Sequence, residues 1–226
     1  MHKVFTRQRL FALPLYFIYL GYSACTTAQA LPTDSELNSV GERYLELASA
    51  SFGAALEEAL IMQQAIEAFL DQPDLETLGA AKSAWSLARK PYAEIEAFRF
   101  GNLIIDDWEP QLNAWPLDEG FIDYVDQGSY FYELGNPVGQ ANLIANTSLS
   151  YGPQVLDLTD LSADLLASLN ELGGTEANVA TGWHAIEFLL WGQDLNGTGP
   201  GAGNRPVADF ALTEAECSNG NCDRRR

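Results

Sequence analysis

The longest run of helical periodicity, from Ser35 to Leu70, constrains the fold more than any other feature. Apolar residues recur there at steps of three and four, which lines them up on one stripe of a helix. Asp34 or Ser35 can cap its start, and the polar segment 71–74 ends it. We therefore expect one long amphipathic helix with a single buried face. The stripe consists of Leu37, Val40, Tyr44, Leu47, Ala55, Ala59, Met62, Ile66 and Phe69.

A second helix is expected from about Leu75 to Phe100, where apolar residues again follow helical spacing. Pro91 lies inside this pattern, so a kink is expected there, because proline removes one backbone donor. Gly101 provides the stop.

The remainder of the chain is less regular. Residues 102–160 carry scattered glycine and proline, which predicts short helices and long loops. Helices are expected over Asp160–Leu172 and Thr175–Trp191, followed by a glycine- and asparagine-rich loop over 193–206. Because the strand signal is weak throughout, the predicted fold is all-α: a helical bundle with long irregular loops.

Residues 1–30 are typical of a secretory signal peptide. Basic residues precede a short apolar run, and Ala28-Gln29-Ala30 provides a cleavage site of small residues. Lipidation at Cys25 is the alternative and would anchor the protein to a membrane. Residues 31–226 would then form one domain in the periplasm or cell envelope, without a membrane span.

Cysteine usage also favours export. With Cys25 assigned to the signal or to a lipid, Cys217 and Cys222 remain, separated by the polar segment Ser-Asn-Gly-Asn. Outside the cytoplasm such a pair is expected to form a disulfide. A two-cysteine metal clip would need further cysteine or histidine ligands nearby, and the sequence offers none.

The charge balance narrows the range of partners. The formal net charge is −19, from 31 acidic and 12 basic residues. Such a chain repels nucleic acid and anionic lipid, and it favours cations and basic partners. The same charge can also serve solubility alone.

The sequence Gly182-Trp-His184-Ala-Ile-Glu187 is the most informative local motif. His184 and Glu187 are three residues apart in an expected helix, so they share one face. The surrounding apolar residues predict that this helix is buried, where polar groups need partners. The pair can therefore bind one metal ion, or it can be a structural histidine–glutamate contact.

A second cluster lies on the helix expected over 75–100. It comprises Trp85, Arg89, Tyr92, Glu96 and Arg99. Glu96 and Arg99 can form a local ion pair. Alternatively, Glu96 lies across from His184 as a further ligand, and Asp118 of the Trp115-Pro-Leu-Asp118 segment adds a carboxylate.

Four segments of the chain resemble the imelysin family. They are 84–101, 114–120, 182–194 and 196–206, and the resemblance extends roughly over residues 35–226. It implies an all-helical fold of two related bundles, export, and a role in iron acquisition or metal binding. The family's Gly-x-His-x-x-Glu motif is matched by Gly182, His184 and Glu187, and related metal-binding domains suggest carboxylate ligands near Glu96 and Asp118. Family members are usually longer, so this chain is expected to hold the N-terminal half.

The leading hypothesis is thus an envelope protein that binds a divalent metal, iron above all, and that hands it to an envelope iron-transport partner. One imidazole with several carboxylates suits iron or manganese. The second hypothesis is a zinc metallopeptidase, the activity that gave the family its name. That activity usually needs three protein ligands and a general base, and residues 31–226 contain one histidine. The third is a metal-free module that binds a protein or small ligand.

Overall fold

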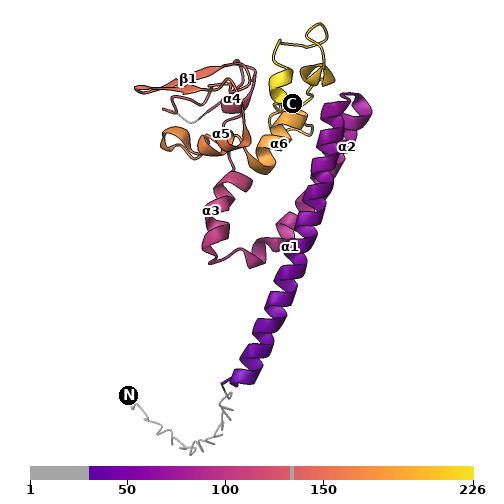
Figure 1. Cartoon of the computed structure of the whole chain (residues 1–226), viewed down its shortest axis with the longest axis vertical. Coiled ribbons are helices and arrows are strands. Elements are labelled where there is room, and N and C mark those ends of the chain that lie inside the picture. Colours follow the sequence, from indigo (N-terminus) through magenta and orange to yellow (C-terminus); the bar gives the residue numbers. More distant parts are fainter. Residues whose placement is uncertain (1–30, 133–134) are drawn as a thin grey trace, which may run out of the picture. The chain divides into compact units, whose positions relative to one another are not determined.

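The computed structural model describes residues 31–132 and 135–226 (Figure 1). The predicted signal peptide and Cys25 lie outside these residues. The chain divides into two compact units between Val40 and Gly41. The site described below lies within the second unit, Gly41–Arg226. In the part of the chain that the structure describes, helices dominate and there is one small hairpin, which confirms the all-α prediction. Within the described ranges, no helix is both long and apolar enough to cross a membrane.

The first two helices follow the periodicity closely. Helix α1 spans Asp34–Asp71, and α2 spans Leu75–Glu94. The Asp74 carboxylate accepts a hydrogen bond from the Thr77 backbone N–H, and the Thr77 hydroxyl oxygen accepts one from the Asp74 backbone N–H. Together these two bonds make a capping box. Pro91 lies in the last turn of α2, and a 3-10 turn, η1 over Ile95–Phe98, replaces the α-helix predicted to continue to Phe100.

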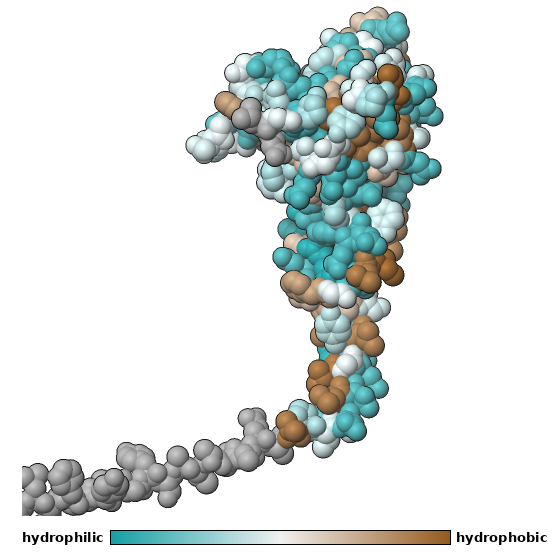
Figure 2. All heavy atoms as spheres, turned by 90° about the vertical axis from the view of Figure 1, so that its left-hand side faces the viewer, coloured by the Kyte–Doolittle hydropathy of each residue, from teal (hydrophilic) through white to brown (hydrophobic). Residues whose placement is uncertain are grey.

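The apolar stripe of α1 is buried only over its second half. Ala55, Met62 and Phe69 are buried, whereas Tyr44 and Leu47 keep 47% and 43% of their surface exposed. Periodicity defines which residues share a face, but burial also needs a neighbouring element along the whole face. Apolar side chains on the exposed surface of α1 are visible as brown spheres in Figure 2.

The irregular region holds α3 (Leu103–Leu112), α4 (Glu119–Ile122) and a β-hairpin that the sequence did not predict. Strands β1 (Ser148–Tyr151) and β2 (Gln154–Asp157) pair antiparallel. Leu149 lies opposite Leu156, and both pack against the core cluster beneath. The strands have only four residues each, too short for alternation to stand out from a loop.

Two predicted helices are shorter than expected. Helix α5 covers only Ala163–Ser168, followed by a 3-10 turn η2 over Leu172–Gly174, and α6 covers Gly182–Trp191 rather than starting at Thr175. Asn178 explains the late start of α6. Its side chain is 0% exposed and donates to the Leu172 carbonyl at 2.6 Å, a bond to the backbone that favours a turn over a helix. Two further 3-10 turns, η3 (Val207–Phe210) and η4 (Asp223–Arg225), follow α6.

Helix α6 contributes side chains to three hydrophobic clusters of the interior (Figure 1). Phe188 joins the cluster formed with α4, α5 and the hairpin. Trp183 joins the cluster of α1 and α2, and Leu190 joins a third cluster with Phe69 and Phe210. Because one short helix contributes to all three clusters, the polar groups on it are held in a fixed position.

Candidate functional site

The side chains of His184 and Glu187 contact each other on α6. The Nδ1 atom of His184 lies 2.9 Å from Oε2 of Glu187, and the two side chains are 17% and 41% exposed. The Trp115 ring packs on the imidazole, with centroids 4.7 Å apart. Nε2 of His184 makes no hydrogen bond to any described residue, so this nitrogen is available to a ligand while Glu187 orients the ring.

Gly182 starts α6 at a point where no side chain fits. Its φ is +82°, and a Cβ there would collide with the backbone carbonyl oxygens of Gln111 and Leu112 at the end of α3. The neighbouring Thr181 hydroxyl donates to the Gln111 carbonyl at 2.9 Å. The glycine of the motif therefore allows α3 to approach the start of the helix that carries His184.

The second cluster from the sequence analysis lies on α2 and at the end of η1, and its side chains contact α3 and α6. The Arg89 guanidinium lies over the rings of Trp85, Tyr92 and Trp183, and it donates to Asn113 at 2.7 Å. Arg99 pairs with Glu109 of α3 at 2.6 Å, rather than with Glu96. Trp85 donates its ring N–H to the Trp183 carbonyl at 3.0 Å. These contacts help to position the start of α6.

A pocket of about 260 Å³ opens beside the histidine. Its polar lining comes from His184, Glu187, Glu119 and Asp194, of which the last two were not singled out in the sequence. The pKa of Glu119 is raised to about 7, chiefly by burial; the charge of Arg205 opposes the rise, and the charges of Asp194 and Glu187 add to it. Three carboxylates thus share the pocket with one imidazole.

The two other predicted ligands lie elsewhere. Glu96 is exposed on η1 and does not line the pocket. Asp118 is buried, at 4% exposure, and its carboxylate accepts from Asn136 at 2.5 Å and from the Tyr130 hydroxyl at 3.1 Å. Burial raises the pKa of Asp118, and those two hydrogen bonds oppose the rise. The structure therefore brings together His184 and Glu187 but places neither Glu96 nor Asp118 beside them.

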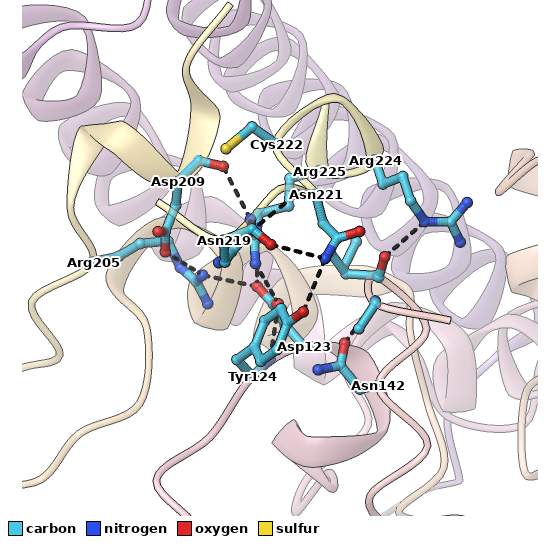
Figure 3. Close-up of polar contacts among 12 residues, drawn as sticks. Asp123, Tyr124, Asn142, Arg205, Asp209, Asn219, Asn221, Cys222, Arg224 and Arg225 are labelled. Atoms are coloured by element: carbon cyan, nitrogen blue, oxygen red, sulfur yellow. Dashed lines mark hydrogen bonds and ion pairs between the residues drawn. The ribbon is translucent and has the colours of Figure 1, made fainter. Parts of the chain in front are cut away.

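A buried charged cluster joins α4, the end of α6 and the C-terminal segment (Figure 3). Asp123 ends α4 and accepts from Arg205 at 2.8 Å and from Arg225 at 2.7 and 2.8 Å. Arg205 also donates to the Phe188 carbonyl near the end of α6, at 3.3 Å. Burial would raise the pKa of Asp123, but the bonds from Arg225 and both arginine charges hold that pKa below its usual range.

The C-terminal residues complete this cluster. Cys217 and Cys222 form the predicted disulfide, which closes a loop in which Asn219 accepts from Arg225 at 2.9 Å. Arg224 donates five hydrogen bonds to backbone carbonyls within 143–146 and 158–159. One feature of the sequence points to these residues, the carboxylate of Asp123 inside the apolar run 121–125, but it does not indicate which arginines contact that carboxylate.

The pocket offers donors that fit a metal ion. An imidazole nitrogen and carboxylate oxygens are ligands for iron, manganese or zinc. In the side-chain positions of residues 31–132 and 135–226, however, no three His, Cys, Asp or Glu groups converge as a metal site requires. A metal at His184 would therefore need Glu119 or Asp194 to turn toward the His184–Glu187 pair.

The fold and the pocket define a helical protein with a histidine–carboxylate pair on a helix that packs into its core. The imelysin family profile matches residues 48–223, so the chain belongs to the imelysin family. Iron-regulated protein A from Synechococcus elongatus is 27% identical over 97 residues, which is 43% of this chain and 26% of that protein. The chain thus matches well under half the length of this relative.

Proposed function

We propose that this imelysin-family protein binds iron or another divalent metal in the His184 pocket, as an exported protein of the cell envelope. The observation that carries the proposal is the free Nε2 of His184, oriented by Glu187 in a pocket with two further carboxylates. Hydrogen bonding of the remote ring nitrogen is the usual arrangement of a metal-binding histidine. The Synechococcus relative is named as an iron-regulated protein, which supports iron as the metal.

Export is proposed from the N-terminal sequence and from the disulfide. The signal pattern of residues 1–30 directs the chain out of the cytoplasm. The disulfide between Cys217 and Cys222 is of the kind that persists in an oxidising compartment. Both a free periplasmic protein and a lipid-anchored protein fit this proposal. An iron-transport partner in the envelope would receive the metal.

Within the pocket, we assign His184 as the central ligand. Glu187 either orients its ring or joins it on the metal, and Glu119 and Asp194 supply the remaining carboxylates. Glu96 and Asp118 remain predicted ligands, and the titration described next tests them as well. A peptidase would use the same pocket, but it needs a general base in addition to its ligands.

The test is calorimetric titration of the chelator-treated chain with ferrous iron, manganese and zinc. We expect one saturable site, weakened at least tenfold by His184→Ala, since loss of a ligand or its orienting partner typically costs about 10- to 100-fold. Glu187→Gln keeps a hydrogen-bond acceptor and distinguishes an orienting role from direct binding. Glu57→Gln, on the exposed surface of α1, is the matched control.

Three further results bear on the proposal. Unchanged affinity in Glu96→Ala and Asp118→Asn would restrict the site to the pocket residues. Metal-dependent cleavage of a peptide library, lost in His184→Ala, would favour the peptidase. Absence of any metal binding by the folded chain would overturn both metal functions.

A further inference from the structure

Trp115 lies outside the hydrophobic clusters, although it is one of the largest apolar residues of the chain. It keeps 69% of its surface exposed, whereas Trp85, Trp183 and Trp191 pack in or against those clusters. Among the described residues, the aromatic ring that Trp115 contacts is the imidazole of His184, with centroids 4.7 Å apart and planes inclined by 47°. Stabilisation by burial scales with the area removed from water, so core packing does not explain the place of this indole.

The backbone holds Trp115 beside the pocket. Trp115, Leu117 and Glu119 line the pocket, and Asp118 between them is buried and does not line it. Asp118 has an extended backbone, and its N–H donates to the Ala177 carbonyl at 2.8 Å. Alternate residues therefore face the pocket, as expected for extended backbone. The indole is placed by an anchored segment of chain rather than by its own burial.

Trp115 and Glu187 contact different parts of the His184 ring. Oε2 of Glu187 lies 2.9 Å from Nδ1 at one edge of the imidazole, and the indole lies against the ring itself. The lone pair that a ring nitrogen offers to a metal lies in the plane of the ring, on the outer edge. Both contacts therefore leave Nε2 free, and this nitrogen makes no hydrogen bond to any described residue.

Two contacts fix the imidazole better than one. A single hydrogen bond at Nδ1 still lets the ring rotate about that bond, whereas packing by the indole restricts the rotation. The His184 side chain is only 17% exposed, although it lines an open pocket. A ligand held in its binding orientation loses less conformational freedom when the metal binds, which raises the affinity.

We propose that Trp115 is a positioning residue of the metal site. Its indole holds the His184 imidazole in the plane that presents Nε2 to the metal, while Glu187 fixes the proton on Nδ1. The inference rests on the proposed function, because it concerns the ligand assigned there. Trp115 does not bind the metal itself, since the indole N–H is a donor without a lone pair to offer.

The first measurement is calorimetric titration of the chelator-treated protein with zinc and with manganese. Trp115→Ala should weaken binding about tenfold, as for loss of a partner that orients a metal-binding histidine. Trp115→Phe keeps an aromatic ring against the imidazole and should retain most of the affinity. Trp108→Ala is the matched control, because Trp108 is also exposed, at 55%, and does not line the pocket. All three variants should unfold in urea at the wild-type midpoint.

The second measurement needs no metal. Nitrogen-15 NMR of the metal-free protein at pH 8, where an ordinary imidazole is neutral, reports which ring nitrogen carries the proton. The spectrum of His184→Ala identifies the His184 signals. We expect the proton on Nδ1 in wild type, Trp115→Phe and Trp108→Ala, and a mixture of both tautomers in Trp115→Ala. A purely structural role for Trp115 would leave the tautomer unchanged.

Two outcomes would overturn the proposal. They are equal metal affinity of Trp115→Ala and wild type, and an unchanged His184 tautomer in Trp115→Ala. If wild type bound no metal, the proposed function would fail by itself, and the tautomer measurement would still decide whether Trp115 positions His184.

Discussion

Arg225 and Asp123 form an ion pair with two hydrogen bonds, in which both side chains are 0% exposed. The two residues are separated by about a hundred positions in sequence, and Asp123 ends the short helix that begins with Glu119 of the pocket. The C-terminal segment therefore stabilises one wall of the candidate site from inside the protein.

Replacement of Arg225 should be strongly destabilising. Arg225→Ala leaves Asp123 with Arg205 as its only cationic partner among the described residues, and breaking a buried pair costs about 3–5 kcal/mol. Urea unfolding measures this loss. Arg226→Ala is the control, because that neighbouring side chain is exposed, and its stability should stay within about 0.5 kcal/mol of wild type. Equal stability of the two variants would contradict the buried pair.

Reduction of the disulfide should lower stability more modestly. The bond between Cys217 and Cys222 closes a short loop, and the chain-entropy account gives about 2 kcal/mol for a loop of this size. Asn219 within the loop accepts from Arg225, so some loss of protection of the Asp123 cluster is also expected. Urea unfolding with and without reductant tests the first effect, and hydrogen exchange at residues 119–125 tests the second. If the stability of a Cys217→Ser/Cys222→Ser protein did not change with reductant, the effect in wild type would be assigned to this disulfide.

A methyl group at Gly182 should disrupt the start of α6. Gly182→Ala forces a side chain against the Gln111 and Leu112 carbonyls at a positive φ, and we expect a loss of about 2–4 kcal/mol. Gly79→Ala is the matched control. Gly79 lies within α2 with open space around its Cβ position, so alanine there should stabilise by about 0.5–1 kcal/mol. Unfolding curves of both variants in urea decide the matter, and opposite signs are required.

The stability of the metal-free protein should fall as the pH rises from about 5 to 8. The pKa of Glu119 is about 7 in the folded protein against an ordinary value of 4.5, so the folded state holds a proton that the unfolded state releases. That stabilisation is complete below pH 4.5 and is lost as the pH rises through 7. Glu119→Gln should remove the slope, worth on the order of 1–2 kcal/mol after allowance for solvent screening.

Unfolding of wild type and Glu119→Gln at several pH values measures that difference. The depressed pKa of Asp123 acts in the opposite direction, but only near and below its ordinary value of 3.8. The two groups are therefore separated by the pH range chosen. A wild-type slope that persists unchanged in Glu119→Gln would rule out Glu119 as its source.

Much of the helical framework could be predicted from the sequence. The bounds expected for α1 and for the start of α2 differ from the structure by at most one residue, because long periodic patterns and the Asp74 cap act locally. The helix expected over 175–191 begins only at Gly182, because Asn178 makes buried contacts with distant residues. The hairpin was missed since its strands are too short to show a period.

The sequence by itself determined the local features of the candidate site. The spacing of His184 and Glu187 places them on one face of a helix, and the cysteine spacing allows the disulfide. Only the tertiary structure decided which carboxylates lie beside them, Glu119 and Asp194, and which arginines reach Asp123. Helical spacing acts within a few residues, whereas these contacts depend on how loops distant in sequence pack together.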